Sequence, residues 1–217
     1  MSDNSLIKKN IVLIANGKFP QHSKPLQLID DAQYIICCDG AANLLKNNSK
    51  VPDIIIGDLD SINNDFIKPE RSKIIYIKNQ NENDLRKALY WISENMKIKK
   101  LSIIGSTGLR EDHTLGNIAS FLYYKYNFEI EIVTDTGLFH VINQSKNIKT
   151  YTGQYVSLFC INEKQRVTTT GLKYELKDTS INLYSATLNS AKKNQITINL
   201  KLDIPVLVYL CYENEKN

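Results

Sequence analysis

Short apolar runs alternate with helical segments between Ile11 and Asp135, and this alternation constrains the fold more than any other feature of the sequence. The runs are mostly apolar at consecutive positions, as is typical of strands buried on both faces. They lie at 11–15, 34–38, 54–56, 74–77, 101–104 and 131–135. Helices are expected at 25–31, from Ala41 towards Asn47, from Asn83 or Asp84 to Met96, and from Thr114 to Tyr126. The pattern predicts an α/β domain with a mostly parallel sheet covered on both faces.

The pattern changes after Gly137. Short β-rich segments separated by turn residues follow one another, and no helical periodicity is present. These segments are 138–142, 155–161, 166–170, 196–202 and 205–212. Such a succession is typical of a small antiparallel β-sandwich. Because no Gly/Ser-rich or Pro-rich linker separates the halves, we expect two closely packed domains, residues 1–138 and 139–217.

Two aspartates, Asp58 and Asp60, follow the apolar run Ile54–Ile56 directly after Gly57. Side chains at alternate positions of an extended segment point the same way, so both carboxylates can converge at the carboxyl end of a strand. Open α/β sheets bind their ligands at that end. Two such charges at ~4 Å repel by about 4 kcal/mol at an effective dielectric of 20. The pair therefore favours a bound cation, and oxygen ligands suit Mg²⁺. A turn with Asp capping the next segment is the alternative.

Polar residues, together with glycines, also follow other strands of the expected parallel sheet. They are Asp39 and Gly40 after the second run, Gln80 and Asp84 after the fourth, and Gly105, Gly108, Arg110, Asp112 and His113 after the fifth. Helix capping by Asp39 or Asp84 and a structural role for His113 are the alternatives. Helix starts offer free N–H groups to phosphates, and Arg110 adds a planar donor. Neither a P-loop nor a GxGxxG fingerprint occurs. The residues predict a Mg²⁺-dependent site for a phosphorylated compound.

Composition limits the function further. The net charge of +4 favours an anionic substrate, but the lysines are scattered, so nucleic acid is not expected as a partner. The cysteines form no CxxC pair and are expected to be small core residues in a reducing compartment. They are Cys37, Cys38, Cys160 and Cys211. The chain starts without an apolar signal region and contains no membrane-spanning run, so a cytoplasmic protein is expected.

Several blocks of sequence, in order along the chain, resemble the thiamine pyrophosphokinase family. They are CDGAANLL at 38–45, PDIIIGDLDS at 52–61, QNENDLRKAL at 80–89, GSTGLREDHTLGN at 105–117 and GLKYEL at 171–176. The resemblance implies a Rossmann-like catalytic domain, a β-sandwich that helps to bind thiamine, and a homodimer with active sites at the interface. In that family Mg-ATP gives its β,γ-diphosphoryl group to the thiamine hydroxyl, and AMP leaves.

The resemblance also implies roles for individual residues. Asp58, Asp60 and Asp84 would hold Mg²⁺. The nucleotide would contact Asn16, Gly17, Asp39, Gly40, Ser61, Gln80, Lys87, Gly105, Arg110, Asp112, His113 and Asn117. Thr187 and Asn189 would contact thiamine. Mg²⁺ and Arg110 can stabilise the charge that develops on the phosphate oxygens, and Asp84 or Asp112 would accept the proton of the hydroxyl.

Two other functions remain open from the sequence. The acceptor of the diphosphoryl group could be another hydroxymethyl heterocycle, such as a pterin, because only the acceptor pocket would differ. The chain could instead be a regulatory module that binds Mg-ATP without turnover. The number of carboxylates argues against this second alternative, since a sensor needs fewer of them.

Overall fold

The computed structural model describes residues 10–45, 50–62 and 72–213, and the chain folds into two compact units. The first unit contains the described residues up to Asn117 together with residues 126–135. The second contains residues 118–125 and the described residues from Thr136 onward. No helix in these described ranges is both long and apolar enough to cross a membrane.

The first unit is built on a parallel sheet, as the alternating pattern predicts. In the order β6-β5-β1-β2-β3-β4, every neighbouring pair of these strands runs parallel. The bounds are β1 Ile11–Ile14, β2 Tyr34–Cys38, β3 Ile54–Gly57, β4 Lys73–Tyr76, β5 Lys100–Ile104 and β6 Glu129–Val133. From β1 the chain builds the sheet first towards β4 and then, from β5, in the other direction. The strand order therefore reverses between β1 and β5, which is where such sheets leave a ligand crevice.

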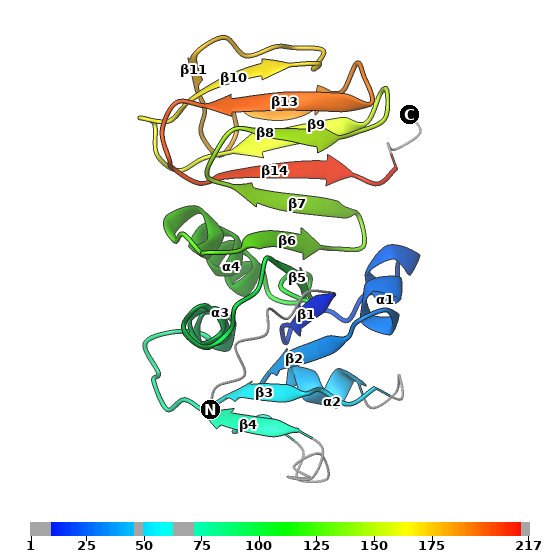
Figure 1. The fold of residues 1–217 in the computed structure, drawn as a ribbon, viewed down its shortest axis with the longest axis vertical. Helices are drawn as coiled ribbons and strands as arrows, with labels where there is room; N and C mark the ends of the chain where they lie inside the picture. Colours follow the sequence, from blue (N-terminus) through cyan, green and yellow to red (C-terminus); the bar gives the residue numbers. More distant parts are fainter. Residues whose placement is uncertain (1–9, 46–49, 63–71, 214–217) are drawn as a thin grey trace. The chain divides into compact units, whose positions relative to one another are not determined.

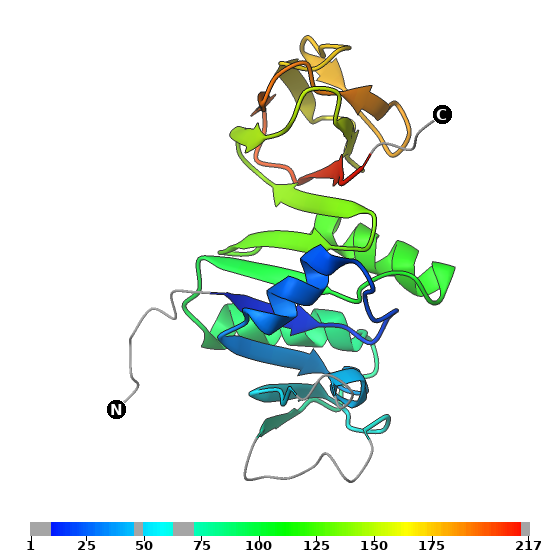
Figure 2. The ribbon, with the colours of Figure 1, turned by 90° about the vertical axis from the view of Figure 1, so that its right-hand side faces the viewer.

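Helices cover both faces of this sheet. α1 (Ser23–Asp30) and α2 (Ala41–Leu45) lie on one face, and α3 (Asp84–Asn95) lies on the other (Figure 1). Figure 2 shows α1 in front of β1. The apolar residues of α3 recur at helical spacing and are buried against the sheet; they are Leu85, Ala88, Leu89 and Ile92.

The entry into α1 is fixed by two side chains. His22 caps the helix, because its Nδ1 accepts from the backbone N–H of Lys24 at 3.1 Å. The Oδ1 of Asp135, which follows β6, accepts from the N–H groups of Gln21 and His22 at 2.8 and 3.0 Å. A residue beyond the last strand of the unit thus anchors the segment between β1 and α1.

α4 spans Glu111–Tyr123, so it begins three residues earlier than the periodicity predicts and ends before the expected Tyr126. The earlier start has a physical cause. Glu111 and Asp112 place negative charge in the first turn, where the helix dipole favours it. The N–H of Thr114 donates to the carbonyl of Arg110 at 3.0 Å, so the first helical bond already begins at that arginine.

The second unit consists of two antiparallel sheets, which confirms the predicted sandwich. One has the order β12-β9-β14-β7 and the other β11-β10-β13-β8. The bounds are β7 Gly137–Ile142, β8 Lys146–Lys149, β9 Tyr155–Phe159, β10 Arg166–Thr170, β11 Thr179–Ser180, β12 Ala186–Ser190, β13 Gln195–Leu200 and β14 Val206–Cys211. Alternate residues of both sheets form a common core, as in Val156 and Leu158 of β9 and Ile196 and Ile198 of β13.

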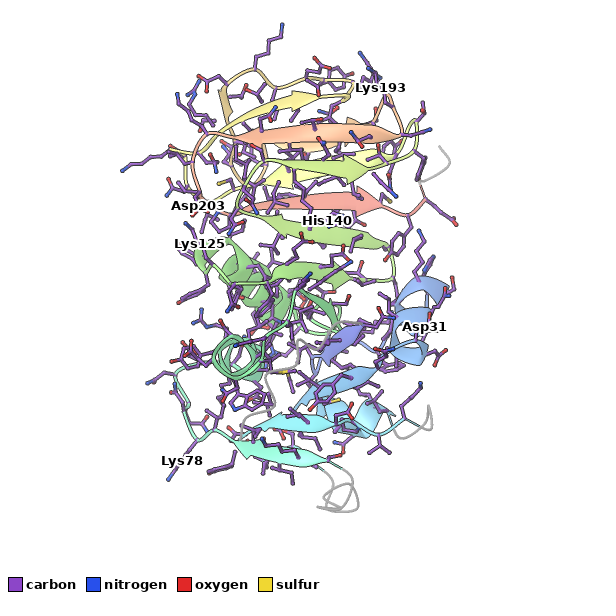
Figure 3. All side chains as sticks on the ribbon, in the orientation of Figure 1. Asp31, Lys78, Lys125, His140, Lys193 and Asp203 are labelled. Carbon is purple, nitrogen blue, oxygen red and sulfur yellow. The ribbon has the colours of Figure 1, made fainter. Side chains whose placement is uncertain are left out.

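An ion pair connects the two sequence segments of this unit. The Nζ of Lys125, just after α4, lies 2.6 Å from the Oδ2 of Asp203, in the segment before β14 (Figure 3). Both side chains are exposed, so the pair contributes little to stability.

Candidate active site

Three carboxylates converge at the carboxyl ends of β2 and β3. Asp39 follows β2, and Asp58 and Asp60 follow β3. One oxygen of each lies within 4.8 Å of those of the other two. Asp39 is only 2% exposed, and its Oδ1 has no hydrogen-bond partner among the described residues. A buried carboxylate oxygen without a partner favours a bound cation, so these ligand types fit Mg²⁺.

The pKa of Asp39 reflects this crowding. Burial raises the pKa of its carboxyl to about 6, and the nearby charges of Asp84 and Asp60 add to the rise. The hydrogen bond that Asp39 Oδ2 accepts from the N–H of Ser61, at 3.3 Å, opposes the shift. Ser61 also donates through Oγ to Asp60 Oδ1 at 2.7 Å. The serine therefore connects the two neighbouring carboxylates.

The close approach of β2 and β3 depends on Gly57. A Cβ at this position would lie 2.8 Å from the Cβ of Asp39, which is too short for a normal contact. Asp39 and Leu59 also adopt positive φ angles of 34° and 65°. Such conformations are uncommon outside glycine and are often found where a functional site constrains the backbone.

Lys87, from the first turns of α3, is a buried cation beside this cluster. Its Nζ lies 2.9 Å from Asp84 Oδ1 and 3.4 Å from Asp58 Oδ2. Burial works to lower the pKa of this ammonium, but the two carboxylates outweigh it and the pKa is raised. Asp58 is partly buried, which works to raise its pKa, yet the hydrogen bond from Gln80 Nε2 at 2.9 Å and the charge of Lys87 lower it.

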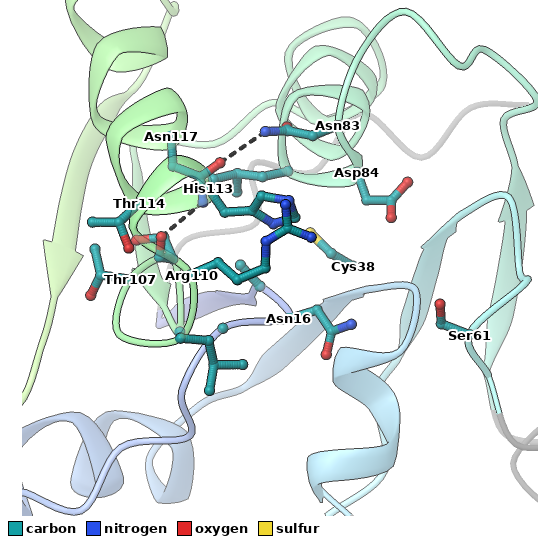
Figure 4. Close-up of a pocket in the computed structure, with 16 residues that line it drawn as sticks. Asn16, Cys38, Ser61, Asn83, Asp84, Thr107, Arg110, His113, Thr114 and Asn117 are labelled. Carbon is teal, nitrogen blue, oxygen red and sulfur yellow. Dashed lines mark hydrogen bonds between the residues drawn. The ribbon is translucent and has the colours of Figure 1, made fainter.

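Asp84 occupies a different place from the other three carboxylates. The sequence predicts it as a third metal ligand, whereas the structure pairs it with Lys87 and groups Asp39 with Asp58 and Asp60 instead. Asp84 still faces the neighbouring cavity (Figure 4). The sequence places Asp39 beside the nucleotide, and nothing in its local context indicates that it would be buried next to the pair.

A cavity of about 350 Å³ opens beside the acidic cluster. Its wall is formed by the segments after β1, β3 and β5 and by the first turns of α3 and α4 (Figure 4). Several predicted site residues line it: Asn16, Gly17, Ser61, Asp84, Gly105, Arg110, His113 and Asn117. The lining also includes residues that the sequence did not single out, namely Cys38, Asn83, Ser106, Thr107, Leu109 and Thr114. Among them, the sequence indicated Asn83 and Thr114 only as possible helix starts and not as site residues.

The segments after β1 and β5 meet through glycines at the point where the strand order reverses. The N–H of Gly17 donates to the carbonyl of Gly105 at 2.7 Å. A Cβ at Gly17 would lie 2.2 Å from that same oxygen, and Gly105 has a positive φ of 70°. No other residue type fits Gly17 without moving the backbone.

Arg110 is held by Asp112 at the start of α4. Its Nε and Nη2 donate to Asp112 Oδ1 and Oδ2 at 3.1 and 2.6 Å, a bidentate arrangement. These hydrogen bonds from Arg110 lower the pKa of Asp112 to about 2, and the N–H of His113 contributes by donating to Oδ1 at 2.9 Å. Asp112 is thus a weak base whose ionised form orients the guanidinium.

The residues predicted for thiamine, Thr187 and Asn189, lie in β12 of the second unit. Asn189 is buried, and its amide pairs with the backbone of Tyr174. It accepts from the tyrosine N–H at 3.0 Å and donates to the tyrosine carbonyl at 2.6 Å. Thr187 is exposed and donates through Oγ1 to the carbonyl of Tyr184 at 3.2 Å. Asn189 therefore holds the segment 171–176 against β12.

Comparisons with known proteins agree with this architecture. Residues 26–134 match the family model "Thiamin pyrophosphokinase, catalytic domain", and residues 137–209 match "Thiamin pyrophosphokinase, substrate-binding domain". A comparison with curated protein sequences finds no match.

Solved structures with a similar fold include thiamine pyrophosphokinases from three organisms. The Bacillus subtilis protein is 23% identical with a TM-score of 0.76, over 94% of this chain and 100% of that chain. The Candida albicans protein is 17% identical with a TM-score of 0.77, over 94% and 90%. The yeast protein is 22% identical with a TM-score of 0.74, over 92% and 86%. At these identities, the likeness to the three structures shows the fold.

Proposed function

The chain belongs to the thiamin pyrophosphokinase family, and we propose that it transfers the diphosphoryl group of Mg-ATP to the hydroxyl of thiamine and releases AMP. The observation that best supports the proposal is the acidic cluster of Asp39, Asp58 and Asp60 beside a cavity that Arg110 also lines. This combination offers oxygen ligands for a divalent cation and a planar donor for phosphate oxygens.

Each group in the cluster has a proposed role. Asp58 and Asp60 hold Mg²⁺, and the partnerless oxygen of Asp39 makes this residue a further ligand beside the predicted Asp84. Mg²⁺ supplies electrostatic stabilisation of the charge on the transferred phosphates. Arg110, kept in orientation by Asp112, binds phosphate oxygens from the α4 side of the cavity. Lys87 keeps the carboxylates of Asp58 and Asp84 in place.

The proton of the thiamine hydroxyl needs an acceptor. Asp84 and Asp112 are the carboxylates considered for this role from the sequence. A group with a pKa of about 2 accepts a proton poorly near neutral pH, which argues against Asp112. Of the two we therefore favour Asp84, which faces the cavity. An Asp84 that accepts the proton would not at the same time ligate Mg²⁺, which Asp39, Asp58 and Asp60 would then hold.

The remaining predicted contacts belong to the same proposal. Residues 1–138 would bind ATP and Mg²⁺ and residues 139–217 would bind thiamine, with Thr187 and Asn189 completing the acceptor site of the partner in a homodimer. Light scattering together with activity assays on dilution tests this arrangement. A protein that is monomeric and keeps full activity would contradict it.

The decisive experiment separates the products. An ordinary kinase transfers the γ-phosphoryl group and releases ADP, whereas the proposed reaction exposes the β-phosphorus to the alcohol. Incubation with thiamine, ATP and Mg²⁺ should give AMP and thiamine diphosphate in equal amounts, without thiamine monophosphate. The Asp60→Asn variant should fold normally and lose at least about 100-fold in kcat. Accumulation of ADP with a singly phosphorylated acceptor would contradict the proposed function.

The choice of acceptor has its own test. The test is a thermal-shift screen of thiamine, pterins and nucleotides with Mg²⁺. Thiamine and ATP should each raise the melting temperature of the protein, because ligands that bind the native state stabilise it. If a pterin raises the melting temperature and thiamine does not, the acceptor is a pterin and not thiamine.

A further inference from the structure

A chain of side-chain amides joins the two helices that border the cavity. Asn83 caps α3, and its Oδ1 accepts from the N–H of Arg86 at 3.0 Å. This bond fixes the orientation of the amide, so that Nδ2 faces Asn117 of α4 and donates to its Oδ1 at 2.9 Å (Figure 4). The Asn117 amide is oriented in turn, and its Nδ2 donates to the carbonyl of Ser106 at 2.8 Å. Both amides therefore accept through their oxygen on one side and donate through their nitrogen on the other, so that the donors point from α3 towards Ser106.

The far end of this chain is the loop that carries Arg110. Ser106 is buried and lies at the start of the loop between β5 and α4. α4 holds this loop at a second point, where the N–H of Gly108 donates to Thr114 Oγ1 at 3.3 Å. The position of Arg110 therefore depends on two anchors in α4, and one of them, Asn117, is bonded to α3.

The near end of the chain is the acidic side of the cavity. Asn83 directly precedes Asp84 and lies in the same helix start as Lys87, which contacts two carboxylates of the site. The amide chain thus connects the part of the molecule that holds the carboxylates to the part that holds the arginine.

We propose that Asn83 and Asn117 are positioning residues that fix the Arg110 loop relative to the carboxylate-bearing start of α3. The inference rests on the proposed function, because it concerns the placement of groups on two sides of a bound triphosphate. Phosphoryl transfer depends mainly on placement and electrostatics, and an error of about 1 Å can reduce a rate by about 100-fold.

The test uses substitutions that break one bond and keep the rest. Asn83→Asp retains the oxygen that caps α3, since Asp and Asn are equally good caps, but it removes the donor to Asn117. Asn117→Asp retains the acceptor and places an oxygen opposite the Ser106 carbonyl. Asn95→Asp is the matched control, because the exposed Asn95 at the other end of α3 donates to the carbonyl of Trp91 at 2.9 Å.

We expect Asn83→Asp and Asn117→Asp to lower kcat by about 10- to 100-fold, with a smaller change in the KM of Mg-ATP. Melting temperatures should change by no more than about 4 °C, and Asn95→Asp should stay within about twofold of wild-type kcat. The single variants Asn83→Ser and Asn117→Ser should also lower kcat, and the double variant that combines them should lose no more than the worse of these two, because either change breaks the same chain.

A loss of kcat that only follows the unfolded fraction would overturn the proposal, as would variants of Asn83 and Asn117 that behave like Asn95→Asp. Amide hydrogen exchange of residues 105–113 tests the same link without turnover. Exchange in this segment should be faster in Asn83→Asp than in Asn95→Asp, and equal exchange would overturn the proposal. If the wild-type protein releases no AMP, the proposed function fails, while the exchange result still decides the link.

Discussion

The buried carboxylate of Asp39 allows a quantitative test of the acidic site. Burial raises its pKa from an ordinary value of 3.8 to about 6. Two pH units correspond to about 3 kcal/mol, which is an upper value for the effect on stability. Between these two pH values the folded protein keeps a proton that the unfolded chain has released. The stability contributed by this group is therefore fully present below about pH 4 and is lost as the pH rises through about 6.

We expect Asp39→Asn to raise the free energy of unfolding by about 1 to 3 kcal/mol in EDTA at about pH 7.5, because a neutral amide avoids burying a charge. Asn tolerates the positive φ of 34° at this position as well as Asp does, so backbone strain does not change. Urea unfolding between about pH 4 and 8 measures the difference, which should shrink towards the acidic end. The exposed Asp30→Asn is the control.

Mg²⁺ should reverse the advantage of the Asp39→Asn variant. Under the proposed function only the wild-type protein keeps all the proposed Mg²⁺ ligands, so added Mg²⁺ should stabilise it more than the variant. A variant that is less stable than wild type in EDTA near neutral pH, or a difference that does not depend on pH, would refute the reasoning about this carboxylate.

Two further substitutions test the packing around the site. Lys87→Met should lower the free energy of unfolding in EDTA by about 2 kcal/mol, because it leaves the carboxylates of Asp58 and Asp84 without their buried partner. Urea unfolding measures the change, and an unchanged midpoint would show that solvent already screens these two charges. Gly17→Ala should lower it by about 3 kcal/mol, since the new Cβ meets the carbonyl of Gly105 at 2.2 Å. Gly116→Ala is the control, because nothing lies within 4 Å of a Cβ there, and its free energy of unfolding should rise by about 1 kcal/mol through helix propensity. Equal melting curves for both alanine variants would contradict the argument.

Much of the architecture could be predicted because strands and helices leave local patterns of apolar residues in the sequence. Consecutive apolar residues mark β1, β2 and β3, and helical spacing marks α3, so the parallel sheet and its helices follow from the sequence. The family resemblance was also confirmed. In the second unit the sequence missed β8, β11 and β12. β8 reads KNIK, and Ile148 is its only buried residue, so it carries too little hydrophobic signal to be recognised.

The candidate site was harder to predict, because its geometry depends on contacts between distant segments. Strand ends could be recognised, and several residues predicted there do line one cavity. The burial of Asp39 depends on how closely Gly57 lets β3 approach, and no local pattern records that distance. Lys87 resembles an ordinary helix lysine in sequence, yet it is buried because α3 carries it to a carboxylate 29 positions earlier in the chain. The roles predicted for the individual residues stay predictions.

The anchoring of α1 by Asp135 has a consequence for biosynthesis. The N–H groups of Gln21 and His22 donate to the carboxylate of Asp135, which lies 114 and 113 positions further along the chain. These hydrogen bonds cannot form before Asp135 has been synthesised. The segment that contains Gln21 and His22 begins at Asn16 and Gly17, which form part of the cavity wall. A contact of such long range forms late, since the intervening chain must first be ordered. We therefore expect that, on the ribosome, this wall of the cavity becomes ordered only after Asp135 has emerged.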